Sequence, residues 1–273
     1  MNSATRPLSA TAVLAALLAV AGVAAAQSHP AATPGSGGAG LTSPAGTSAL
    51  RALTKPANMT VTETSAGLTL ATTQSALLNR PLSFRGTTAR SRAGDTVVVE
   101  RRRAGGSGPW ATTATATVDS AGSFTTTWRV SQSGRLSIRA LVLPPGATPP
   151  IGAPGAAATA AAAAPATAPS AAPSSVTVTV LRIQVASWYG PGFFGHRTAC
   201  GQRLRATTLG VASPNVKCGR LVDLVYHGRS LTVPVVDRGP YASGVQWDLT
   251  EATAIALGMR KTDAVGALPI GPN

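Results

Sequence analysis

The sequence is poor in acidic residues, lysine, aromatic residues and cysteine, and these shortages narrow the classes of protein it can represent. Among 273 residues, 9 are Asp or Glu and 23 are Lys or Arg, giving a formal net charge of +14. Such an excess attracts anionic polymers. Aromatic residues make up only 4% of the chain. Because the arginines are scattered over expected strands with few aromatic neighbours, we expect no nucleic-acid partner.

Long hydrophobic runs are also scarce, and the one that stands out lies near the N-terminus. Residues 11–26 are apolar and follow Arg6, which is typical of a secretory signal peptide over residues 1–26. This run is shorter than the ~20 residues of a spanning helix, although an uncleaved signal could act as an anchor. We expect a secreted or cell-wall-associated monomer without membrane contact after signal cleavage.

The chain has two cysteines, Cys200 and Cys218. In an exported protein an even number favours a disulfide, which here would close a loop of about 18 residues. The alternative is a metal site that uses both thiolates and His196. Since there is no C-x-x-C pair and no further clustered His, we expect no metal site and no cofactor.

Composition divides the N-terminal two thirds of the chain into three parts. Residues 27–56 are rich in Pro, Gly, Ser, Thr and Ala and predict a disordered spacer. Residues 57–143 contain short alternating strands separated by turn signals, which predicts an immunoglobulin-like β-sandwich. Trp110 and Trp128 are interpreted as its large core residues, with carbohydrate stacking as the alternative.

An Ala/Pro-rich linker, residues 144–174, follows the expected sandwich. The strand-like stretch after it, residues 175–182, either completes the sandwich or leads directly into the next domain. The sequence leaves both possibilities open.

The C-terminal domain, residues 183–273, is expected to be mainly β with one short helix. The tripeptide HGR predicts a turn between two strands, and WDLTEATAIALGM predicts the helix. Asp248 is the expected N-cap, Glu251 the second member of a capping box, and Gly258 the C-terminal stop.

The stretch VVDRGPY places Asp237 at the end of an apolar strand. Period-two alternation puts Asp237 on the same side as Val233 and Val235, at the rim of the core. A partly desolvated carboxyl there would have a raised pKa, suited to a general acid for glycosidic cleavage, although Arg238 would lower it. The alternative is that Asp237 only accepts backbone hydrogen bonds in the turn that follows.

Four motifs in order, ASWYGPGFFGHRTACGQRL, GVASPNVKCG, LTVPVVDRGPY and WDLTEATAIALGM, resemble the rare lipoprotein A-like (RlpA-like) double-psi β-barrel family, related to expansin and barwin barrels. The resemblance covers about 80 residues of the chain. It implies a six-stranded barrel that engages peptidoglycan glycan strands, and lytic transglycosylase activity that leaves 1,6-anhydro products.

The resemblance also implies site residues. The family's proposed catalytic aspartate corresponds to Asp237, as general acid. Gln202 stands at a family Glu position and Ser213 at a family His position. Since Gln cannot donate a carboxyl proton and Ser is a poor acid, the resemblance predicts a degraded active site.

Further residues are expected in the wall of a glycan groove. Trp188 and Tyr189 could stack on sugar rings or pack in the barrel. Thr198, Arg238 and Tyr241 are expected to contact glycan, with ordinary surface positions as the alternative for Thr198 and Tyr241.

Other constellations are less favoured by the sequence. His196 and His227 are expected in loops, and a triad of Ser187, His227 and Asp237 lacks a nucleophile elbow.

Three functions therefore follow from the sequence: a weakened transglycosylase, a non-catalytic expansin-like module that binds or loosens the wall, and a protein-interaction module. Fold alone does not decide among them.

Overall fold

The computed structural model describes residues 44–147 and 174–271. The expected signal peptide, the first part of the spacer and most of the Ala/Pro linker lie outside these residues. All described residues belong to the compact unit Ala32–Asn273. Within the described ranges, no helix combines the length and apolar character needed to cross a membrane.

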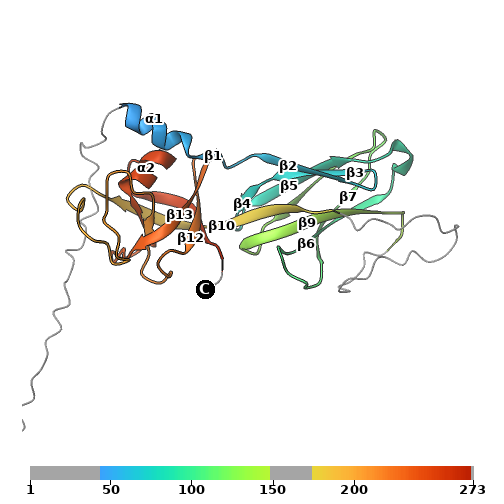
Figure 1. The fold of residues 1–273 in the computed structure, drawn as a ribbon. Helices are drawn as coiled ribbons and strands as arrows, with labels where there is room; N and C mark the ends of the chain where they lie inside the picture. The colour runs from blue at the N-terminus through green and yellow to red at the C-terminus, as the bar shows by residue number, and fades with distance from the viewer. Residues whose placement is uncertain (1–43, 148–173, 272–273) are drawn as a thin grey trace, which may run out of the picture. The chain divides into compact units, whose positions relative to one another are not determined.

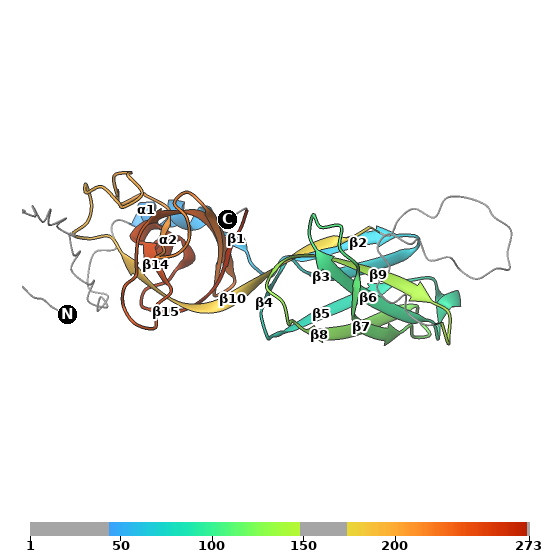
Figure 2. The same cartoon turned by 90° about the horizontal axis from the view of Figure 1, so that it is seen from below.

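The C-terminal residues fold into a closed six-stranded barrel (Figure 2). Its strands run in the order β14-β11-β13-β12-β15-β10, and pairing between β14 and β10 closes the ring. The β10–β14 and β11–β13 pairs are parallel and the other four are antiparallel. The expected mainly β fold with a C-terminal six-stranded barrel is confirmed. The bounds are β10 Val176–Tyr189, β11 Val211–Ala212, β12 Leu221–Tyr226, β13 Arg229–Asp237, β14 Trp247–Thr250 and β15 Asp263–Pro269.

Alternation along these strands fills the barrel with apolar side chains, among them Val211, Val233 and Leu249, each fully buried. The expected HGR turn is present between β12 and β13. His227 and Gly228 both have positive φ, 44° and 77°, and join strands in which Tyr226 pairs with Arg229. Two positive φ values are the requirement of a type I′ hairpin turn.

The barrel helix, α2 (Glu251–Leu257), begins later than the sequence predicted. Its N-cap is Thr250, whose side chain accepts a hydrogen bond from the Thr253 amide, so the assignment of the cap to Asp248 was wrong. Asp248 lies inside β14, because residues 247–250 pair with β10. Glu251 is the first helical residue and belongs to no Asp-x-x-Glu box. The expected stop at Gly258 is confirmed by its φ of 82°.

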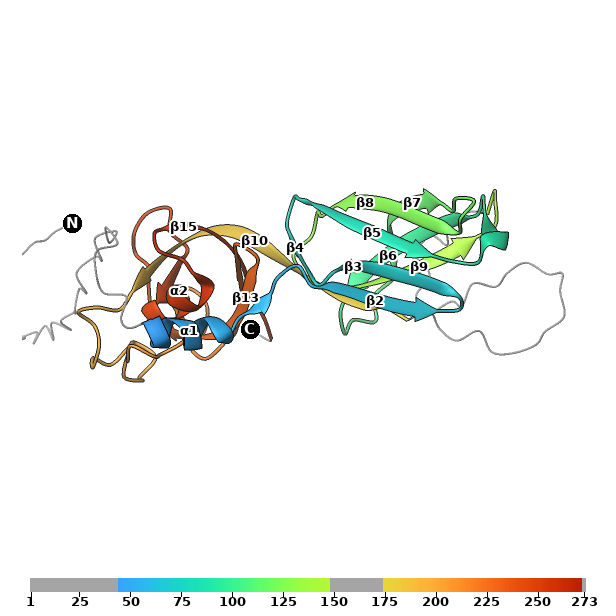
Figure 3. The ribbon, with the colours of Figure 1, turned by 90° about the horizontal axis from the view of Figure 1, so that it is seen from above.

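Part of the expected spacer is ordered and packs on the barrel. Residues of α1 (Pro44–Ala52) lie against α2, as Figures 1 and 3 show, and β1 (Lys55–Pro56) pairs with β13. The Ala57 amide donates to Gly228 O at 2.9 Å, and Ser230 Oγ donates to Lys55 O at 3.1 Å. Composition missed this segment because its contacts are to residues more than 170 positions away.

Deleting residues 44–57 should lower the free energy of unfolding by about 2 kcal/mol, since it uncovers α2 and removes both hydrogen bonds, each contributing about 1 kcal/mol. Urea denaturation would measure this, with an equally long deletion of residues 30–43 as the control. Equal midpoints for the two deletions would contradict the prediction.

Ahead of the barrel, two sheets pack face to face (Figure 3). One has the order β2-β3-β5-β8, and the other contains β4, β10, β9, β6 and β7. Their shared core includes Phe84, Val97 and Ile138. The immunoglobulin-like topology stays a prediction. The bounds are β2 Thr60–Ser65, β3 Leu68–Thr73, β4 Ser75–Leu77, β5 Pro81–Thr87, η1 Arg90–Arg92, β6 Thr96–Arg103, β7 Ala111–Thr117, β8 Ser123–Arg129 and β9 Gly134–Leu143.

The two tryptophans of this region differ in environment. Trp128 is 9% exposed and belongs to the core, as expected. Trp110 lies outside that cluster, with the guanidinium groups of Arg102 and Arg139 at 4.4 and 4.2 Å from its ring centroid. Arg139 is also paired with the buried Glu100 at 2.7 Å. The indole of Trp110 therefore contacts cations rather than apolar core.

Strand β10 resolves the alternatives left open for residues 175–182. Its first part pairs with β9, from Val176 opposite Ile138 to Val180 opposite Gly134. Its second part pairs with β15 and β14 in the barrel. The same strand is thus the last strand of the sandwich and the first strand of the barrel.

Candidate active site

Four neighbouring barrel strands carry a row of side chains that includes two carboxylates. Ser187 of β10 is opposite Asp248 of β14, Asp248 is opposite Ala212 of β11, and Ala212 is opposite Asp237 of β13. Residues opposite one another in a sheet project on the same face. Ala212 packs with Tyr189 and not with the barrel interior, so the row lies on the outer face of the barrel.

A β-bulge turns Asp237 onto that outer face. Val211 is paired with Val235, while Ala212 is paired with Asp237, so Val236 is the extra residue. Simple alternation from Val235 placed Asp237 on the core side, and this part of the prediction was wrong. Bulges commonly redirect a side chain beside a functional site. Val236 is accommodated at Gly210, where any added Cβ would lie 2.5 Å from its side chain.

Asp237 accepts hydrogen bonds from three donors. The amides of Ala199 and Arg238 both donate to Oδ1 at 2.8 Å, and Tyr189 Oη donates to Oδ2 at 3.3 Å. These bonds fix the position of the Asp237 carboxylate. The bond from the Arg238 amide is the turn contact considered from the sequence, and the other two attach Asp237 to distant segments.

Asp248 is a half-buried carboxyl with a shifted pKa. Burial raises the pKa of Asp248 to about 6, the hydrogen bond from Ser187 lowers it, and the nearby charge of Asp237 raises it further. The Ser187 hydroxyl donates to Oδ1 at 2.8 Å. Burial, Asp237 and Asp248 also raise the pKa of Tyr189, so its phenol stays a neutral donor. The row therefore combines a carboxylate fixed by three donors, Asp237, with a carboxyl of raised pKa, Asp248.

The raised pKa of Asp248 predicts a pH-dependent stability difference. In the native state this group keeps its proton up to about pH 6, whereas in the unfolded state it releases it near 3.8. The stabilisation is complete below pH 4 and is lost as pH rises through 6. Relative to Asp248→Asn, the native chain should lose on the order of 2 kcal/mol between these values. Urea denaturation of both chains at pH 4 and 7 would test this, and a constant difference would refute it.

One edge of the row is covered by the loop that follows β10. Phe193 lies edge-on to Tyr189, with ring centroids 6.1 Å apart, and Leu204 is 2% exposed beside Ala212. The predicted disulfide is confirmed: Cys200 and Cys218 are bonded. Their sulfurs are therefore not available as thiolate ligands for the metal site considered with His196. Within the described ranges, no group of three or more His, Cys, Asp and Glu is arranged to hold a metal ion.

The expected groove residues are distributed unevenly. Tyr189 lies in the site, whereas Trp188, on the other side of β10, packs against the barrel core. Thr198 is 7% exposed and its hydroxyl has no partner among the described residues. Gln202 is exposed in the covering loop, and its carbonyl accepts from the Thr198 amide at 2.8 Å. Tyr241 is 72% exposed.

Ser213 and Arg238 hold the backbone beside Asp237. The Ser213 amide donates to Asp237 O at 3.2 Å, and its hydroxyl accepts from the Val216 amide at 3.3 Å. Arg238 Nη1 donates to the carbonyls of Ser213 and Val216 at 3.1 and 2.9 Å. Because these groups bond one another, they position the end of β13.

Sequence reasoning missed Ser187 and Asp248 as site residues. Alternation in ASWY was sufficient to place Ser187 and Tyr189 on one face. Asp248 was assigned to a helix cap because Asp before an apolar helical pattern is a common cap signal. Only the strand pairing of residues 247–250 shows its place in the row.

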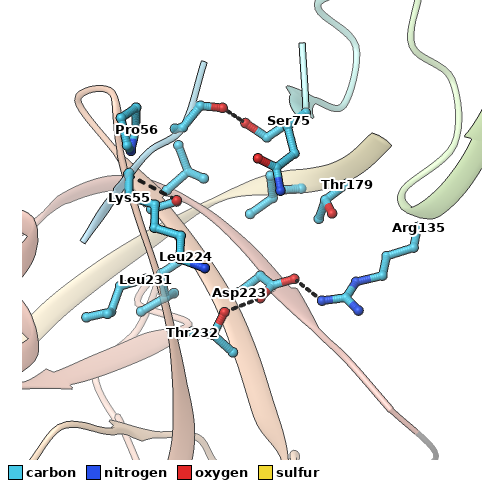
Figure 4. A pocket seen from close by; sticks show the side chains of 14 residues that line it. Lys55, Pro56, Ser75, Arg135, Thr179, Asp223, Leu224, Leu231 and Thr232 are labelled. Atoms are coloured by element: carbon cyan, nitrogen blue, oxygen red, sulfur yellow. Dashed lines mark hydrogen bonds and ion pairs between the residues drawn. The ribbon is translucent and has the colours of Figure 1, made fainter. Parts of the chain in front are cut away.

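A pocket of about 220 Å³ lies elsewhere in the same compact unit, lined by residues of β1, β12 and β13 among others (Figure 4). Its carboxylate, Asp223, accepts from Thr232 Oγ1 at 2.6 Å and from Arg135 at 3.1 Å. Thr232 precedes Asp237 by five residues along β13. Both oxygens of Asp223 accept hydrogen bonds within the protein. Replacing Asp223 is therefore a suitable control for variants of the two carboxylates in the row.

The fold and the site together define a closed six-stranded barrel with two carboxylates on its outer face. Residues 183–270 match a family model described as "Lytic transglycolase". An RlpA-like double-psi β-barrel is thereby confirmed for this region.

Curated relatives match the same part of the chain. A probable endolytic peptidoglycan transglycosylase RlpA from Synechocystis is 39% identical over 88 residues, 31% of this chain and 27% of that protein. One from Aquifex aeolicus is 42% identical over 76 residues, 27% and 34% of the two chains. The endolytic peptidoglycan transglycosylase RlpA of Campylobacter jejuni is 32% identical over 77 residues, 28% of each. The matches thus span about a third or less of these relatives.

Among solved structures, the Streptomyces papain inhibitor aligns with 32% of this chain and 92% of its own, at 22% identity and a TM-score of 0.25.

Proposed function

We propose that this protein is exported and acts on the glycan strands of peptidoglycan through its barrel, as a lytic transglycosylase. The observation that carries the proposal is the placement of Asp237 and Asp248 on the same outer face, on either side of Ala212, in a barrel matched by a lytic transglycolase model. Cleavage of this kind needs a proton for the leaving oxygen and a negative charge near the sugar that becomes positive.

The two carboxylates divide these tasks. The sequence predicted Asp237 as the acid, but the raised pKa of Asp248 makes Asp248 the better proton donor, while Asp237 is fixed by three hydrogen-bond donors. Asp248 gives its proton to the glycosidic oxygen as the bond from that oxygen to C1 breaks. Asp237 stabilises the positive charge that develops on the sugar. The 6-hydroxyl oxygen then bonds to C1 and returns its proton to Asp248, so no water is consumed.

Hydrogen bonds within the protein support this arrangement. Ser187 orients the Asp248 carboxyl, while Tyr189 and the Ala199 amide fix Asp237. The family Glu and His positions are held by an exposed Gln202 and a buried Ser213. Since neither supplies an acid, the proposed activity depends on the carboxylate pair and is expected to be weak.

A direct test is to incubate residues 27–273 with intact and with amidase-treated peptidoglycan and to search for 1,6-anhydromuropeptides by mass spectrometry. The longer chain is used because α1 and β1 pack on the barrel. Anhydro products support the proposal, and their absence with both substrates rejects cleavage.

The second candidate is a non-catalytic module that binds or loosens the wall. It is favoured by the loss of acid side chains at Gln202 and Ser213. Sedimentation with sacculi without anhydro product would establish it, whereas binding to a partner protein without glycan binding would favour an interaction module.

A further inference from the structure

A second, strongly basic hollow lies at the end of the barrel where both helices finish. It has a volume of about 390 Å³ and is lined by Arg51 at the end of α1, by Tyr226, His227 and Arg229 at the β12–β13 turn, by Leu257 and Gly258 at the end of α2, and by Arg260 and Lys261 beyond it. We call this set the helix-end pocket. None of its lining residues is acidic, and four carry permanent positive charge.

The cations of the helix-end pocket lack carboxylate partners in the described part of the chain. The three ion pairs found there all involve other residues. Arg51 Nε is buried without a hydrogen-bond partner among the described residues, and Arg229 reaches only Thr54 Oγ1, at 3.5 Å. Arg260 and Lys261 are exposed. Several cations thus surround one hollow without a directly bonded carboxylate.

The nearest carboxylate along the chain, Asp263, is already engaged. Hydrogen bonds from the Ala264 amide and Tyr226 Oη lower the pKa of Asp263, and the charges of Lys261 and His227 lower it further. Tyr226 Oη lies 2.9 Å from its Oδ2. One carboxylate offsets one charge of the four.

Helix ends supply only part of the remaining negative charge. Each helix C-terminus is equivalent to roughly half an elementary charge, so two together offset about one. Carbonyls near both ends also accept local hydrogen bonds, among them Arg51 O from the Thr54 amide and Ala254 O from the Met259 amide. A bound anion would balance the positive charge that remains around the pocket.

We propose that the helix-end pocket binds phosphate groups of a polyanionic polymer whose backbone contains phosphate. Guanidinium groups match phosphate oxygens with paired N–H donors, and Arg51, Arg229 and Arg260 reach the pocket from three different segments. A polymer fits better than a single phosphate because the whole chain carries a net charge of +14, which attracts an extended polyanion over many contacts. This binding does not depend on the chemistry of Asp237 and Asp248.

The test uses the chain from residue 27 on and three probes at fixed ionic strength: long-chain polyphosphate, tripolyphosphate and inorganic phosphate. Arg51→Gln/Arg260→Gln should weaken polyphosphate binding, measured by titration calorimetry, by about tenfold or more. Arg85→Gln/Arg90→Gln removes the same charge from exposed residues of the sandwich and should change the affinity for polyphosphate by less than about twofold.

Each other outcome overturns the proposal. Equal weakening by both double variants would show attraction by net charge alone. Tripolyphosphate or phosphate binding as tightly as the polymer would replace it with a small phosphorylated ligand. Equal affinity for poly-glutamate would remove the phosphate preference, and no binding of polyphosphate would remove the site. Circular dichroism of each variant distinguishes loss of binding from loss of folding.

Discussion

Replacing Asp248 by Asn should reduce the formation of 1,6-anhydro products by at least about 100-fold, because the variant has no proton to give to the leaving oxygen. Asn keeps the size of the side chain and can still accept the hydrogen bond from Ser187, so folding should be preserved. Initial rates of anhydromuropeptide release, measured by mass spectrometry between pH 4.5 and 8, would give the result.

The pH profile separates the roles of the two carboxylates. With Asp248 as acid, the rate of the native chain should fall as pH rises through about 6, where this group loses its proton. Asp237→Asn should also reduce the rate strongly, by about 100-fold, because a preorganised charge near the reacting sugar is lost. The residual activity of Asp237→Asn should retain a pH-dependent fall, and that of Asp248→Asn should not.

Asp223→Asn is the matched control for both variants. Asp223 is a carboxylate of the same barrel that is bound by Arg135 and Thr232 outside the row. Its replacement should leave the rate within about twofold, apart from effects on stability. Undiminished product from Asp248→Asn would refute the assignment of the acid. Undiminished product from Asp237→Asn would remove Asp237 from the mechanism.

Removing the disulfide with Cys200→Ser/Cys218→Ser should lower the free energy of unfolding by about 3 kcal/mol, the value expected for closing a loop of this length. The bonded residues are 18 positions apart in the sequence. Removing the disulfide should also lower the rate of cleavage, because the amide of Ala199, next to Cys200, donates to Asp237 Oδ1 at 2.8 Å.

Urea denaturation and the anhydromuropeptide assay together would test this variant. Gln202→Ala, an exposed change in the same loop, serves as the control and should keep the stability of the native chain. An unchanged midpoint for the double serine variant would show that the loop is held by its other contacts.

The sequence was informative where a local pattern had one structural outcome. The ordered motifs indicated the barrel, the paired cysteines indicated the disulfide, and HGR indicated the turn at His227 and Gly228. Each of these signals lies within a few residues or depends on a covalent bond. Contacts with distant parts of the chain therefore had little effect on the structures that these signals predict.

Prediction failed where pairing between distant segments decided the outcome. Asp248 and Thr250 are both good caps, and only the pairing of β14 with β10 shows that the helix starts after Thr250. Composition assigned residues 44–56 to a spacer, although β1 pairs with β13. Neither signal is present in a single stretch of sequence.

The bulge at Val236 has a consequence for anyone who transfers this site to another scaffold. The DRGP motif alone does not determine which way its aspartate faces, since a regular strand would direct that side chain into the barrel interior. A graft must therefore include the extra backbone residue and the glycine at 210 that makes room for Val236. For protein design, the transferable unit is two adjacent strand ends with their irregular register, rather than the four-residue DRGP motif.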